Sequence, residues 1–476
     1  MSTTSILNSL AGSTAASTAS NLTAILQAAM GASSSGIDVN AAVSSAVTAA
    51  QAPEDSWNSQ ITLLQSESNA LTTIQANVTS LDNDMNALNS LNGPLSSTAV
   101  TSSNTSVVTA TAASGSTTGN NVVVVNNLAS TASFSSTAVA NASTALPAES
   151  VTITNNGGTA ATISTGSGVN TLADLQTAIN GAGLGLTASV ISDASGSRLA
   201  IASDTSGNNG NFTVTTTDPS FSFAQAATGR NASLTVNGIS ISSASNTVTG
   251  AAPGLTLNLL GTSPAGTSVS LSVAPDTATA VTAINQFVTD YNTVMTDLNA
   301  EFANTAGSGQ GALAQDPTVR NLQSTLLQAL NYTATPASGS STTTVPNLTS
   351  MGLSVNADGT LRVDSSTLNS VLQNNFSDVQ NFFQGTALNG FGHSVDQQLT
   401  SFISPADGAF TVDLQSISTQ SRGLQTDITN FEANIITPLR TQLQSSLSQA
   451  EILLQELPNE MKQISTELGQ NSSSGS

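Results

Sequence analysis

The chain has 476 residues, enough for three or four domains of the usual size of roughly 100 to 200 residues. Only 7% of the residues are charged, and the formal net charge is −21. The seven Lys and Arg residues are scattered, which argues against nucleic-acid binding and disfavours anionic membranes, and the lack of cysteine excludes disulfides and thiolate metal sites.

The first part of the chain does not show the pattern of a secretory signal peptide. Residues 1–35 are rich in Ser, Thr and Ala and lack the basic start of a cleavable secretory signal, so we expect a flexible terminal segment. No run in the sequence approaches the roughly 20 apolar residues of a membrane-spanning helix, and we predict no membrane insertion. An extracellular location would therefore require another export route.

Apolar residues near the amino-terminal end follow helical spacing. Val39, Val43 and Val47 lie four residues apart, and a longer helix follows that should stop at Gly93-Pro94. The long helix carries the heptad series Trp57, Leu64, Leu71, Ile74, Val78, Leu81, Met85 and Leu88.

The middle of the chain, from about 100 to 275, shows period-two alternation with Gly and Asn turns, which predicts β-strands. Val122 to Val125 read as a buried strand, and Asn237-Gly238 as a hairpin turn. Residues 160–216 predict a small α+β unit whose helix opens with a capping box, Thr171 and Asp174.

A third heptad series follows Pro275-Asp276 and should pair with residues 64–91. Met351 to Phe383 reads as strand, turn, strand and helix, and the helical region 412–468 should be interrupted at Pro438 and Pro458. The third series is Val281, Ile284, Val288, Tyr291, Met295, Leu298 and Phe302, and the carboxy-terminal one is Leu443, Leu447, Ala450, Leu454, Leu457, Met461, Ile464 and Leu468.

The carboxy-terminal helix should fray without a partner. Burying each heptad side chain would contribute ~1.5 to 3 kcal/mol, whereas fixing each residue costs ~1 to 2 kcal/mol. We therefore expect the apolar stripes at the two ends of the chain to remain uncovered until other molecules bind them. Those stripes are the predicted partner-binding residues Ile37, Val39, Val43, Val47, Leu443, Leu447, Leu454, Leu457, Met461, Ile464 and Leu468.

The sequence offers no catalytic chemistry. His393 is the single histidine, so a two-His zinc motif is impossible, and no Gly-x-Ser-x-Gly elbow accompanies it. Asp358-Gly359 fits a hairpin turn better than a calcium loop, because the closing Glu of an EF-hand is absent. We predict no enzyme activity, no cofactor and no metal.

Several motifs occur in a fixed order along the chain. They are Ser35-Gly-Ile-Asp-Val-Asn40, Ser233-Leu-Thr-Val-Asn-Gly-Ile239, Phe287-Val-Thr-Asp-Tyr-Asn292, Leu313-Ala-Gln-Asp-Pro-Thr-Val-Arg320 and Met351-Gly-Leu-Ser-Val-Asn-Ala-Asp-Gly-Thr-Leu361. In this order they resemble the flagellar filament-capping family, also called hook-associated protein 2. Thr171-Leu-Ala-Asp-Leu-Gln-Thr-Ala-Ile-Asn180 is similar to the Ile-Asn repeat of flagellins and hook-associated proteins.

This resemblance implies an α+β multidomain fold in which terminal coiled-coil helices flank inserted β-rich domains. We expect four domains. They are a helical leg of the flexible segment 1–35 with 440–476, a helical and α+β domain of 36–94 with 276–439, a β-rich domain of 95–130 with 231–275, and an inserted α+β domain of 131–230 that contains the Ile-Asn repeat.

The resemblance also implies a structural cap at the distal end of the bacterial flagellar filament, which guides the folding and insertion of exported flagellin. Expected partners are further copies of the chain, commonly five, flagellin, hook-filament junction proteins and an export chaperone. The protein would be extracellular at the filament tip, exported by the flagellar type III apparatus without a cleaved signal peptide. The sequence leaves two alternatives open, another flagellar axial protein or a surface adhesin.

Overall fold

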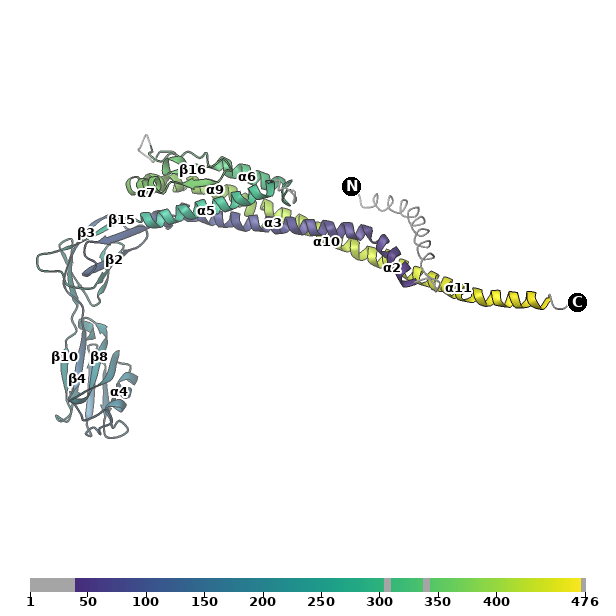
Figure 1. The fold of residues 1–476 in the computed structure, drawn as a ribbon. Coiled ribbons are helices and arrows are strands. Elements are labelled where there is room, and N and C mark those ends of the chain that lie inside the picture. Colours follow the sequence, from purple (N-terminus) through teal and green to yellow (C-terminus); the bar gives the residue numbers. More distant parts are fainter. Residues whose placement is uncertain (1–38, 304–309, 337–342, 472–476) are drawn as a thin grey trace. The chain divides into compact units, whose positions relative to one another are not determined.

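The computed structural model describes residues 39–303, 310–336 and 343–471 (Figure 1). Helices near both ends of the described chain flank β-rich regions, which confirms the predicted fold class. The chain divides into two compact units. Unit 1 takes in the described parts of residues 1–80, 292–327 and 397–476, and unit 2 takes in residues 81–291 and 328–396.

Two long helices, α3 (Ala52–Asn89) and α5 (Thr277–Phe302), contribute to both units. In unit 1, Asn77 Nδ2 on α3 donates to Asp297 Oδ2 on α5 over 2.6 Å. In unit 2, Asp84 on α3 faces Asp290 on α5. The predicted pairing of the first and third heptad series is therefore confirmed. Their buried members include Leu71, Ile74, Val78, Leu81, Met85, Leu88, Ile284, Tyr291, Met295 and Leu298.

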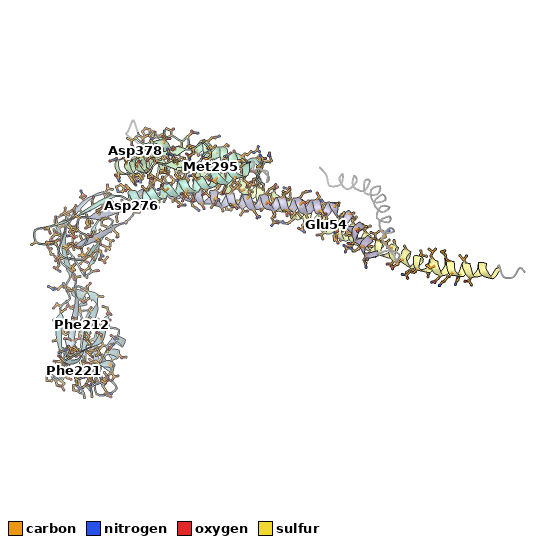
Figure 2. The ribbon with its side chains drawn as sticks, viewed as in Figure 1. Glu54, Phe212, Phe221, Asp276, Met295 and Asp378 are labelled. Carbon is orange, nitrogen blue, oxygen red and sulfur yellow. The ribbon has the colours of Figure 1, made fainter. Side chains whose placement is uncertain are left out.

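The ends of these two helices follow local rules. Asp276 precedes α5 and its carboxylate accepts hydrogen bonds from the N–H and hydroxyl of Thr279 (Figure 2). Helix α3 ends at Asn89, four residues before the predicted stop at Gly93. The other described α-helices outside the β-rich regions are α2 (Val39–Ala50), α6 (Pro317–Ala329), α7 (Ser365–Asn374), α8 (Phe376–Gln384), α9 (Phe391–Ile403), α10 (Ala409–Phe431) and α11 (Thr437–Asn471).

An aromatic cluster forms the helical core of unit 2. Phe391 at the start of α9 is 1% exposed, and its ring centroid lies 5.2 Å from that of Phe382 and 5.8 Å from that of Phe383. Phe287 of α5 and Tyr332 complete the cluster at 5.9 and 5.8 Å from Phe391. Aromatic pairs at these separations stabilise a core beyond the area they bury.

The predicted strand-turn-strand at Met351 to Phe383 is also present in unit 2. Strands β16 (Leu353–Val355) and β17 (Leu361–Val363) pair around Asp358-Gly359. The Asp358 carboxylate accepts from Thr360, as a turn residue does, and the buried Tyr291 hydroxyl donates to the Gly359 carbonyl over 3.2 Å. The hairpin interpretation is therefore confirmed.

The first β-rich region has one core between two sheets. The Asn237-Gly238 hairpin is present, with φ of 54° and 82°. The Val122–Val125 run is only half buried, because Val123 and Val125 face the core while Val122 is 45% exposed. The strand order of the first sheet is β1 (Thr98–Ser102), β15 (Val269–Pro275), β3 (Gly119–Asn127), β11 (Ala232–Val236) and β12 (Ile239–Ser243). The strand order of the second sheet is β13 (Thr247–Ala252), β14 (Leu255–Leu259) and β2 (Val108–Ala112).

The second β-rich region has its own core, which includes Phe212 and Phe221 (Figure 2). The chain enters this region and leaves it at the same place, because Ser130 and Arg230 form an antiparallel bridge with N–H···O distances of 2.9 and 3.2 Å. The strand order of its first sheet is β10 (Phe223–Ala227), β4 (Thr131–Ser136), β8 (Gly196–Ser206) and β7 (Leu186–Asp193). The strand order of its second sheet is β6 (Ala160–Ser164), β5 (Ser150–Asn155) and β9 (Phe212–Thr216).

Helix α4 (Leu172–Gly181) belongs to this second region and has the predicted capping box. The Thr171 hydroxyl accepts from the Asp174 N–H over 3.2 Å, and the Asp174 carboxylate accepts from the Thr171 N–H over 3.0 Å. The Asp174 carboxylate accepts hydrogen bonds from the Asn170 N–H, the Thr171 hydroxyl and the Thr171 N–H, and these lower the pKa of Asp174. The helix is therefore fixed at its first turn by sequence-local contacts.

The Ile-Asn pair at the end of α4 has a clear division of roles. Ile179 is fully buried in the core, whereas the Asn180 side chain lies against the edge strand β7. Its Oδ1 accepts from the Ala188 N–H over 2.7 Å and its Nδ2 donates to the Ala188 carbonyl over 3.1 Å. Asn180 thus occupies the place that another strand would take, and it protects an edge that is otherwise open to pairing.

We expect Asn180→Ala to destabilise the second β-rich region by about 1 to 3 kcal/mol, because it leaves both backbone groups of the buried Ala188 without a partner. Urea unfolding followed by circular dichroism would measure the loss. Light scattering should also show self-association through β7. The control is Thr177→Ala, an exposed position on the same helix, where the change should stay within about 0.5 kcal/mol. Equal stability of the two variants would contradict the role given to Asn180.

Candidate assembly surface

The apolar stripe of the carboxy-terminal helix begins inside unit 1. A five-residue π-helical turn, Glu432–Ile436, joins α10 to α11 just before Pro438. Because proline has no N–H for the normal helical bond, the wider turn accommodates it without ending the helix. The predicted interruption at Pro458 is wrong, since α11 continues through that residue to Asn471.

Helix α2 packs on the first part of α11. Val43 and Val47 are 4% and 5% exposed and form one cluster with the fully buried Ile436. Leu443 and Leu447 pack against this cluster and are partly buried. The expectation that the terminal stripes lack partners is therefore wrong at these four predicted site residues, because the two ends of the chain cover each other there.

The stripe continues beyond this cluster on an exposed face of α11. Leu457, Met461 and Ile464 are 49%, 65% and 55% exposed. The alternating spacing of four and three residues keeps them in line with Leu443 and Leu447. The exposed side chains of Leu457, Met461 and Ile464 are here called the α11 stripe. Ile37 lies outside the described residues, as do the side chains of Val39, Leu454 and Leu468.

Sequence reasoning missed Phe431 and Ile436, which extend the cluster. Ile436 lies one heptad before Leu443, so continuing the series backwards would have found it. Phe431 packs edge-on against Trp57 at 5.4 Å between ring centroids. Leu453, which is 62% exposed, widens the apolar face of α11, but it lies off the heptad positions.

A second apolar feature of unit 1 is a groove of ≈ 380 Å³ between α3 and α10. Leu63, Leu64, Gly423 and Leu424 line it, and Leu63 is 63% exposed. A side chain added at Gly423 would meet nothing within 4 Å, so the glycine leaves an open notch in α10. The helices of this unit therefore present apolar surface at two places.

In the described part of the chain, no three His, Cys, Asp or Glu side chains gather as metal ligands. Arg440 and Glu432, near the start of α11, form an ion pair of 3.9 Å. Among the helices that the structure describes, none combines the length and the hydropathy needed to cross a membrane. Apolar stripes on long helices are typical of subunits that assemble with one another.

Comparison with known families gives the same order of segments. The model of the flagellar hook-associated protein 2 N-terminus matches residues 35–132, and the model of its C-terminus matches residues 229–459. The flagellin hook IN motif matches residues 150–205, the segment that holds α4 and the Asn180 contact. The region between the two terminal models is thus where the second β-rich core lies.

Individual relatives agree with the family models. The B-type flagellar hook-associated protein 2 of Pseudomonas aeruginosa is 31% identical over 246 residues, 45% of this chain and 51% of that protein. Flagellar hook-associated protein 2 of Campylobacter jejuni is 30% identical over 165 residues, 33% of this chain and 25% of that protein. The matches thus span about half or less of these curated relatives.

A solved structure is similar over most of the chain. The D1-D2-D3 domains of the flagellar cap protein FliD from Escherichia coli are 25% identical, with a TM-score of 0.56 over 75% of this chain and 99% of that chain. Models for both ends of one protein match here in the expected order, and a solved structure is similar over 75% of the chain. The chain belongs to the flagellar hook-associated protein 2 family.

Proposed function

We propose that this chain is a subunit of the cap at the distal end of a bacterial flagellar filament, where it guides the folding and insertion of exported flagellin. The observation that carries the proposal is the α11 stripe, an apolar helix face left exposed beyond the contact with α2. Membership of the hook-associated protein 2 family supports it. No catalytic step is part of this function.

The terminal helices are the proposed contact elements. Val43 and Val47 pack α2 on the first part of α11. The α11 stripe beyond this contact would bind neighbouring cap subunits and flagellin. Residues 1–35 with 440–476 would form the leg that enters the filament. Residues 36–94 with 276–439 would form the helical domain above it.

The two β-rich regions are the proposed plate. Residues 95–130 with 231–275 and the inserted residues 131–230 have separate cores, which suits rigid modules held above the growing end. Several copies, commonly five in this family, would form the plate, and hook-filament junction proteins and an export chaperone would be further partners. Export through the flagellar type III apparatus would place the protein outside the cell at the filament tip.

The test is complementation in the organism that encodes the chain. Deleting its gene should stop filament growth and release unpolymerised flagellin into the medium. Supplying the full chain on a plasmid should restore filaments of normal length, and gold-labelled antibody should mark their distal ends. Growth restored with label along the whole shaft would favour the alternative of another axial protein.

The cap function would be wrong if the deleted strain still grew normal filaments. The control is a plasmid that supplies the flagellin gene alone, which should not restore growth. Negative-stain images of the purified full chain at rising concentration should then show a closed oligomer.

A further inference from the structure

Two pairs of carboxyl groups lie between the helices of unit 2. Asp82 and Asp84 are two residues apart on α3 and therefore point to different sides of the helix. Asp82 faces Asp396 of α9, and Asp84 faces Asp290 of α5, so each pair lies close enough for a hydrogen bond to form once one carboxyl group is protonated. A hydrogen bond between two carboxyl groups requires that one of them carries a proton.

The remaining contacts of these groups leave room for that proton. Asp82 Oδ1 and Asp84 Oδ2 are buried, and no N–H or hydroxyl donor of the described residues reaches them. The other oxygen of Asp82 accepts from Asn86 Nδ2 over 3.1 Å, and Asp290 accepts from Gln286 Nε2 over 3.1 Å. Each buried oxygen is satisfied only when the opposing carboxyl group supplies an O–H.

In the described part of the chain, no Lys or Arg acts on either pair to offset its negative charge. Within unit 2 the other titratable side chains on these three helices are His393, one turn before Asp396, and Tyr291, whose hydroxyl is bound to Gly359. The charged groups that act on Asp82 and Asp84 are Asp396 and Asp290, and neither Lys nor Arg is among them. Two unprotonated carboxylates at either site would repel each other directly.

Burial, and then the opposing carboxyl group, raises the pKa of Asp82 to about 6 and that of Asp84 to about 7. The folded chain therefore binds more protons than the unfolded chain above pH 3.8, the ordinary value. The stabilisation is complete below that value and is lost as the pH rises through 6 to 7. Asp82 is only 9% exposed, so solvent relieves little of the repulsion there.

Few carboxylates of this chain can be paired with a cation. Acid unfolding usually comes from protonating carboxylates that are paired with cations. This chain has 28 acidic residues but only seven Lys and Arg residues, so most of its carboxylates have no cation to pair with. The carboxylates that do stabilise the fold when charged are helix caps and turns with lowered pKa values, such as Asp174, Asp276 and Asp364. Hydrogen bonds lower the pKa of Asp364 to about 2, so its cap withstands mild acid.

We propose that the two carboxyl pairs make the packing of α3 against α5 and α9 a proton-dependent joint, tight in mildly acidic surroundings and loosened in alkaline ones.

The test is amide hydrogen exchange on the full chain at about pH 5 and about pH 8, corrected for intrinsic exchange. Protection of residues 78–88 and 281–291 should fall about 10- to 100-fold at the higher pH, since each pKa unit is worth about a factor of 10 and partial exposure screens some of it. Protection in β3 should change much less. Equal protection of the helices at both pH values would overturn the proposal.

A variant sharpens the result. In D82N/D84N each amide can donate to the carboxylate opposite at any pH, so the variant should gain protection at about pH 8 and lose the pH dependence. The control is Glu456→Gln on the exposed face of α11, which removes one charge and should keep the profile of the natural chain. An unchanged pH dependence in D82N/D84N would also overturn the proposal, and exchange of the natural chain decides the question if the variant does not fold.

Discussion

The triple variant L457Q/M461Q/I464Q should fold normally but support no filament growth. These side chains are about half or more exposed, so their replacement removes little buried area, and glutamine is a good helix former. Without them α11 loses the apolar face that neighbouring subunits or flagellin would cover. Complementation of the gene deletion, scored as filament length and as flagellin released into the medium, measures the effect.

The matched control replaces polar residues on the other side of the same helix. Gln455, Asn459 and Gln463 are exposed and lie on the opposite face, so changing them to alanine should leave filament growth intact. Circular dichroism of both variants should be the same. Normal growth of the triple glutamine variant, with the protein exported at normal levels, would remove the α11 stripe from the assembly surface.

Point variants test this surface more sharply than truncation does. Deleting residues 440–476 would also uncover Val43 and Val47, because Leu443 and Leu447 pack against them. A truncated chain could then fail through loss of α2 packing alone. The side chains of the α11 stripe lie beyond that cluster and avoid the ambiguity.

The second large effect is on stability. Phe391→Ala should cost about 3 to 5 kcal/mol, because the side chain is 1% exposed and its removal leaves a cavity among four aromatic rings. Urea unfolding of the full chain followed by circular dichroism at the helix band would measure the loss. Phe391→Leu should cost less, since it retains most of the buried carbon.

The control for this core variant is Val412→Ala on α10. Val412 is 54% exposed, so the change should stay within about 0.5 kcal/mol. Trp57 fluorescence reports separately on unit 1, where its ring packs on Phe431. A loss below about 1 kcal/mol for Phe391→Ala would mean that the cluster relaxes around the gap and does not hold the helices of unit 2 together.

Local signals in the sequence predicted much of the fold. The capping box at Thr171 and the hairpin turn at Asn237-Gly238 act over a few residues, so they can be read without knowing the tertiary structure. The heptad series of α3 and α5 could be matched because both have the same period and a similar length. Pro458 misled the prediction, because a long helix can continue past a proline when the lost bond lies on an exposed turn.

Contacts between segments that lie far apart in the chain could not be predicted from the sequence. Nothing near Val43 indicates that Ile436 covers it, because 392 intervening residues separate them and the pairing depends on the whole fold. Asp82 and Asp84 likewise look like solvated residues on an amphipathic helix. Only the packing of α5 and α9 places Asp290 and Asp396 opposite them.

The bridge between Ser130 and Arg230 gives the chain a modular architecture. The 99 residues between them enter and leave the host sheet side by side, so a tight turn would close the gap after their excision without disturbing the strands on either side. An exchange of this cassette for one with another surface would thus leave the helical part of the chain unchanged.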